Sequence, residues 1–132
     1  MSTRMLNEIL KTLSENGFKA SCFANSDGLI LASTKSAETN EKVIGAMVAM
    51  LSDAAEKAKQ EINLDSLISM KIKYKDATIL SRQIVIENSP TQFLLAALAP
   101  PASNDEIDKY QDELIGWALQ NAYAPLKKLV DL

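Results

Sequence analysis

The chain has 132 residues, of which 47% are hydrophobic, and 17 acidic residues outnumber 14 basic ones to give a net charge of −3. This length and apolar content predict a single domain over residues 1–132, whose core needs no metal or disulfide. Without a dense basic segment, the weakly acidic chain is not expected to bind nucleic acid.

Residue types that enzymes commonly use are scarce. Histidine is absent and Cys22 is the single cysteine, which removes imidazole bases and the common zinc sites. The four glycines are too far apart to form a phosphate-binding loop, so the chain is not expected to bind GTP itself. We therefore predict a protein that is not an enzyme, with no catalytic residue, cofactor or metal site.

Compartment and membrane signals are also weak. The sequence does not open with a secretion signal, and a lone cysteine cannot form an internal disulfide. Apolar stretches such as residues 93–99 are far shorter than the roughly 20 residues that span a bilayer. The prediction is a cytoplasmic protein without direct membrane insertion, in which Cys22 is a buried apolar side chain and not a reactive thiol.

The first elements are a helix and a hairpin. Apolar residues recur at helical spacing between Met5 and Leu13 after a Ser2 or Thr3 cap, and Asn16-Gly17 is typical of a helix end. Alternating residues follow from Phe18, and the turn Ser26-Asp27-Gly28 leads into a second apolar run.

A second helix is predicted from Asn40 and Glu41 to about Ile62. It has an unusually wide apolar surface in its first half, made of two adjacent stripes and several small residues; the stripes are Val43, Met47, Met50 and Ala54, and Ile44, Val48, Leu51 and Ala55. A helix on one sheet needs only one stripe. Together with the small residues Gly45, Ala46 and Ala49, this width indicates that something besides the sheet packs on the helix.

Three strands and a last helix complete the chain. Period-two alternation from Ile68 to Lys75 predicts a half-buried strand with Ile68, Met70, Ile72 and Tyr74 on one face. A second strand covers 78–87, and an almost wholly apolar strand over 91–99 is expected in mid-sheet. Ser103 and Glu106 predict a capping box for the final helix, which Pro125 is expected to kink or break. Trp117 and Tyr123 on this helix are expected to be core residues.

The order of elements, α-β-β-α-β-β-β-α, predicts an α/β fold of the α+β sandwich type. This order, the hairpin over 25–32, the apolar second helix, the hairpin over 68–87 and the long last helix resemble the Roadblock (dynein light chain roadblock) family. The resemblance covers nearly the whole chain. It implies a five-stranded antiparallel sheet with the second helix on one face and the first and last helices on the other.

The resemblance also implies a dimer, in which two second helices pack side by side and the third strands meet at the sheet edges. The chain would pair with itself or with a related Roadblock-type chain. The expected interface residues are Val43, Met47, Met50, Leu51, Ala54, Met70, Ile72 and Tyr74.

The lysines of the third strand allow two interpretations. Alternation alone explains Lys71, Lys73 and Lys75 as a solvated face, whereas the alternative is a basic strip for an acidic partner or a phosphate. Their position at the expected dimer edge is a departure from the pattern, because like charges facing each other across strands are unfavourable.

Members of the resembling family bind Ras-like small GTPases as activators or as scaffolds, so the predicted function is a non-catalytic dimeric platform that binds and regulates such a GTPase. Arg4 and Arg82 are the only arginines and neither lies in a recognisable finger loop, which favours an allosteric mechanism. Two alternatives stay open. One is a purely structural subunit of a motor or membrane-associated complex, and the other is a small-molecule sensor that uses Tyr74, Arg82 and Gln83.

Overall fold

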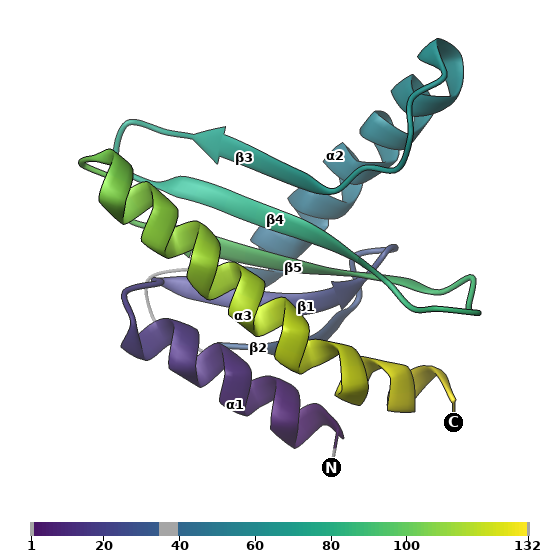
Figure 1. Ribbon diagram of the computed structural model, residues 1–132, viewed down its shortest axis with the longest axis horizontal. Helices are drawn as coiled ribbons and strands as arrows, with labels where there is room; N and C mark the ends of the chain where they lie inside the picture. The colour runs from purple at the N-terminus through teal and green to yellow at the C-terminus, as the bar shows by residue number, and fades with distance from the viewer. Residues whose placement is uncertain (1, 35–39, 132) are drawn as a thin grey trace.

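The computed structural model describes residues 2–34 and 40–131. Three helices and five strands follow the predicted order (Figure 1). Their bounds are α1 (Ser2–Glu15), β1 (Ala20–Asn25), β2 (Ile30–Ser33), α2 (Glu41–Ile62), β3 (Ser69–Lys73), β4 (Thr78–Val85), β5 (Gln92–Ala99) and α3 (Asp105–Val130).

All five strands form one antiparallel sheet in the order β2-β1-β5-β4-β3. The apolar strand β5 lies in the centre as predicted, because it is the strand that both faces of the sheet must bury. The two hairpins stand on either side of it, which leaves β2 and β3 at the edges of the sheet. The predicted fold class is confirmed.

The helices lie on opposite faces of the sheet (Figure 1). On one face, α1 and α3 lie side by side over a core of large side chains such as Leu10, Phe23 and Leu126. On the other face, α2 packs alone, mainly over β1 and β5, on a core of small residues such as Ala20, Cys22 and Ala96. Cys22 is fully buried in this second core, as expected.

Local chemistry explains the turns that hold these layers together. Between β1 and β2, the Asn25 side chain accepts from the backbone N–H groups of Asp27 and Leu29, and Gly28 takes a positive φ of 88°. At the start of α2, the Asn40 side chain caps the helix by accepting from the N–H of Lys42. The hairpin and the capped helix match the predictions.

Four local predictions are corrected. Ser2 and Thr3 lie inside α1 and do not precede it. The cap of α3 is Asn104, whose side chain accepts from the N–H of Ile107 at 2.9 Å, and not Ser103. The strand β3 ends at Lys73, because Tyr74 donates its N–H to Ala77 and opens the turn to β4.

The fourth correction concerns the last helix. Pro125 does not break α3, which continues to Val130, so of the two predicted effects only the break is wrong. Pro125 and Leu126 are buried, and this burial offsets the one hydrogen bond that a proline removes. None of the helices among the described residues has the length and apolar content needed to cross a membrane.

Candidate interaction surface

The apolar stripe Val43, Met47, Met50 and Ala54 lies on the side of α2 that faces away from the sheet. Ile44, Val48 and Ala49 are buried against the sheet, whereas Val43 is 61% exposed and Met50 is 73% exposed. Ala54 and Leu51 are also exposed, and Met47 is half-buried at the margin of the core. The sheet therefore buries Ile44 and Val48 of one stripe, whereas Leu51 and most of the other stripe remain open to solvent, in line with the width of the apolar surface.

Two of the three small residues of α2 have another role from the one expected, whereas the third, Ala46, is exposed. A side chain at Gly45 would place its Cβ 2.7 Å from Ile30 Cδ1 and 3.5 Å from Cys22 Sγ. The Cβ of Ala49 is already within 3.4 Å of the position that a Cβ on Gly28 would take. Gly45 and Ala49 thus let α2 approach the β1–β2 hairpin, and they belong to the core of this chain and not to an external contact.

The second half of α2 extends beyond the sheet (Figure 1). Ser52 is the last buried residue of the helix, and its hydroxyl accepts from Gln83 Nε2 of β4 at 2.9 Å. An open groove of about 480 Å³ separates the extension from the segment that returns to β3; Ala55, Ala58, Leu64, Leu67 and Ile68 contribute its apolar lining.

Three apolar side chains in or near this groove are strongly exposed. Ile62 and Leu64 at the end of α2 are more than half exposed, and Ile68 is 68% exposed just before β3. Alternation had placed Ile68 with Met70 and Ile72 on a half-buried face, which is wrong because α2 leaves the sheet before it can cover Ile68. These residues show that the open apolar surface runs from α2 to the start of β3.

The edge strand β3 continues this surface. Met70 and Ile72 are half-buried and pack against the core under α2, while Tyr74 lies beyond the strand end and is half exposed. Because β3 is the last strand of the sheet, its outer backbone groups have no strand to pair with in the sheet that the described residues form. The eight predicted interface residues thus lie on α2 or on β3 and its end, and three of them, Met47, Met70 and Ile72, pack against the same core.

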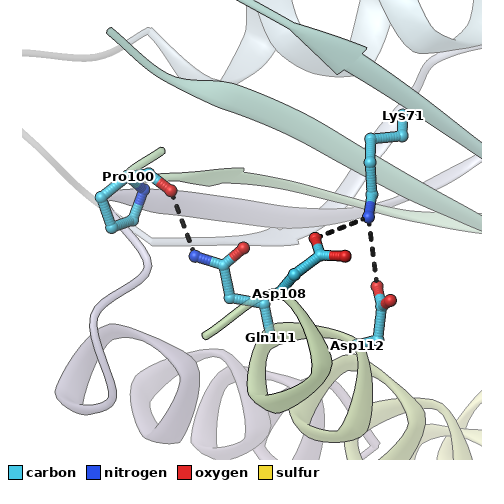
Figure 2. A network of polar contacts seen from close by, with 5 residues as sticks. All are labelled: Lys71, Pro100, Asp108, Gln111 and Asp112. Atoms are coloured by element: carbon cyan, nitrogen blue, oxygen red, sulfur yellow. Dashed lines mark hydrogen bonds and ion pairs between the residues drawn. The ribbon is translucent and has the colours of Figure 1, made fainter. Parts of the chain in front are cut away.

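The lysines of β3 differ from one another. Lys71 points to the opposite face from Met70 and reaches α3, where its Nζ lies 3.0 Å from Asp108 Oδ1 and 3.7 Å from Asp112 Oδ1 (Figure 2). Lys71 is itself partly exposed, with 31% of its side chain accessible; Lys73, and Lys75 just beyond the end of β3, are exposed as well. Sequence patterns missed the two aspartates, because they are more than 35 positions away from Lys71 and only the packing of α3 on the sheet brings them near.

The three polar groups considered for a small-molecule site do not converge. Gln83 bonds to Ser52 on the α2 face, Arg82 lines a small pocket of about 140 Å³ with Asp112 and Ile115 on the α3 face, and Tyr74 lies at the exposed turn. Trp117, expected in the core, is instead 37% exposed on the outer side of α3, next to Met5 of α1. Tyr123 is half-buried, and its hydroxyl accepts from the N–H of Glu87.

Comparisons with known proteins were informative only at the level of structure. No protein-family model matches the chain, and no curated protein matches its sequence. Among solved structures, MglB of Myxococcus xanthus is similar over 97% of this chain and 92% of its own length, with 11% identity and a TM-score of 0.78.

Two further structures agree. One is an MglB with a tetrameric arrangement, which matches 94% of this chain and 92% of its own at 10% identity and a TM-score of 0.69. The other is a Roadblock/LC7 domain from Streptomyces avermitilis, which matches 96% of this chain and 98% of its own at 9% identity and a TM-score of 0.70. Identities this low carry information about architecture alone. The chain therefore has the Roadblock-type fold that its order of elements predicted.

Proposed function

We propose that this chain is a non-catalytic platform that dimerises through α2 and the edge of β3, and that the dimer binds and regulates a Ras-like small GTPase. The observation that carries the proposal is the apolar stripe of Val43, Met47, Met50 and Ala54 on α2, of which all but the half-buried Met47 are exposed. An apolar surface of this kind usually marks a contact between proteins.

A second copy of the chain is the partner that best fits this surface. The groove is lined by residues of α2, the helix that carries the stripe, and by Ser69 at the start of the open edge of β3, so a two-fold arrangement can cover all three at once. The extension of α2 past the edge supports this arrangement, because paired β3 edges would put the second copy's sheet beneath it (Figure 1). The tetrameric arrangement described for one MglB is in keeping with self-association of this fold.

The GTPase part of the proposal rests on the shared fold and on the resemblance to the Roadblock family. The regulation would be allosteric. Arg4 is exposed on α1 beside Glu8, and Arg82 is half-buried on β4, so neither extends from a loop into a partner's nucleotide site. The dimer would act by favouring one arrangement of the GTPase's own catalytic residues.

The experiment is sedimentation equilibrium of the chain alone and with a panel of Ras-like GTPases, each loaded with GDP or with a non-hydrolysable GTP analogue. We expect a dimer that binds one nucleotide state at least about tenfold more tightly, which corresponds to about 1.4 kcal/mol of coupling. A dimer that ignores every GTPase in both states would favour the purely structural subunit. A monomer at micromolar concentration would contradict the proposed interface.

A further inference from the structure

Lys71 is the residue that most directly opposes pairing of the β3 edge. The hydrogen bonds to β4 define which backbone groups of β3 point outward: Tyr74 donates to the Ala77 carbonyl, and the Ile68 carbonyl accepts from Gln83. Because alternate residues of an antiparallel strand point to the same neighbour, Ser69, Lys71 and Lys73 direct their N–H and C=O groups to the open side.

Two-fold pairing of this edge can centre on Met70, Lys71 or Ile72. In each of these registers Lys71 lies directly opposite, or diagonally next to, a lysine of the second copy. Cross-strand neighbours at such distances interact strongly enough for like charges to disfavour the pair. An edge lysine is also a common means by which proteins prevent edge-to-edge association.

The surroundings of Lys71 remove this obstacle. Its ammonium group is turned away from the open edge and lies between Asp108 and Asp112, one helical turn apart on α3 (Figure 2). The same stretch of α3 is fixed to the sheet by the buried Gln111, whose side chain donates to the Pro100 carbonyl at 3.1 Å. The ion pairs of Lys71 with the two carboxylates are therefore already present in a single copy.

We propose that Asp108 and Asp112 neutralise Lys71 so that the edge of β3 can pair with β3 of a second copy. The inference rests on the proposed dimer, and it names the groups that allow the β3 edges of two copies to pair. The cluster of Lys71, Asp108 and Asp112 has one surplus negative charge, which is complementary to Lys73 of the other copy in the registers centred on Lys71 and Ile72. The edge of β3 would then no longer repel a second copy and would be complementary in charge to it.

The ion pairs of Lys71 can have a structural role or a neutralising role, and the two roles predict different effects of mutations on dimerisation. If the ion pairs only hold α3 on the sheet, loss of the lysine and loss of the aspartates should have similar effects. If they neutralise an edge charge, loss of the aspartates exposes an unbalanced cation, whereas loss of the lysine removes the problem itself. The comparison of Lys71→Gln with Asp108→Asn/Asp112→Asn separates the two roles.

The test is the dimer dissociation constant of the full chain by sedimentation equilibrium. We expect Asp108→Asn/Asp112→Asn to raise this constant about tenfold, Lys71→Gln to leave it within about twofold of the wild type, and the triple variant to restore it. The increase should largely disappear at about 1 M salt, where the screening length is about 3 Å. The matched control is Glu106→Gln/Glu113→Gln, which removes two exposed carboxylates of α3, of which Glu113 pairs with Lys109 of the same helix.

Each result has a defined meaning once circular dichroism shows that the variants fold. Equal weakening by Lys71→Gln and by the double aspartate variant would overturn the inference, and so would an unchanged dissociation constant in the double variant. A wild-type chain that stays monomeric would instead overturn the proposed dimer itself. The last result is read from the wild type alone, so it cannot be confused with the first two.

Discussion

The two faces of the sheet are covered to different extents. Under α1 and α3, two helices share one face and pack on each other, so large side chains such as Leu6, Leu10 and Leu13 are completely or almost completely buried. Under α2, one helix covers a face rich in alanine, and its own outer stripe stays exposed. Two helices can close a face of this sheet, whereas one helix that also extends past the edge leaves apolar surface in water.

The difference teaches where stability and association reside. The α1–α3 face contains most of the large buried side chains, so it should contribute most to the stability of a single copy. The α2 face combines a thin core with an open stripe and a groove beside the open edge of β3, which is the combination expected of an interface. Mutations on the two faces should therefore separate folding from self-association.

The largest effect is expected in the closed face. Leu10→Ala should lower the free energy of unfolding by about 3 kcal/mol, because it leaves a cavity under α1 that neighbouring side chains cannot fill. Met50→Ala on the exposed stripe should change the stability of a single copy by less than about 0.5 kcal/mol. Urea unfolding at several protein concentrations distinguishes this effect from coupled dissociation. Similar losses for both variants would remove the distinction between the faces.

Self-association should respond in the opposite way. Met50→Glu places a charge in the proposed interface and should raise the dimer dissociation constant about 100-fold or more, while the circular dichroism spectrum stays unchanged. The matched control is Met5→Glu, which puts the same charge on an exposed methionine of α1 on the other face. Weakening by Met5→Glu alone would mean that the α1–α3 face, with the exposed Trp117, is the interface.

The smallest effect concerns a glycine in α3. A methyl group at Gly116 would meet nothing within 4 Å, so Gly116→Ala should raise the free energy of unfolding by about 0.5 to 1 kcal/mol through helix propensity alone. Gly17→Ala is a useful control, since its surroundings are equally open but its φ of 105° should make alanine destabilising. If Gly116→Ala abolished self-association, a second copy would have to contact α3 closely at Gly116. That result would contradict the assignment of the interface to the α2 face.

Much of the architecture could be predicted from local patterns. The glycine turn at Gly28, the cap at Asn40, the alternation in β3 and the apolar run of β5 each depend on residues close in sequence. The doubled stripe of α2 also predicted that one side of this helix would lack a partner within the chain. Errors arose where burial competes with a local rule, as at Pro125, or where coverage by a distant helix decides exposure, as at Ile68 and Trp117.

The sequence by itself thus determined the elements, their order and the excess apolar surface of α2, because periodicity and turn chemistry act over a few residues. Only the tertiary structure decided that Gly45 serves the core, that α2 passes the sheet edge, and that Lys71 meets Asp108 and Asp112. Those outcomes depend on how helices cross the sheet. That crossing is the sum of many contacts between residues far apart in the chain, which no local pattern records.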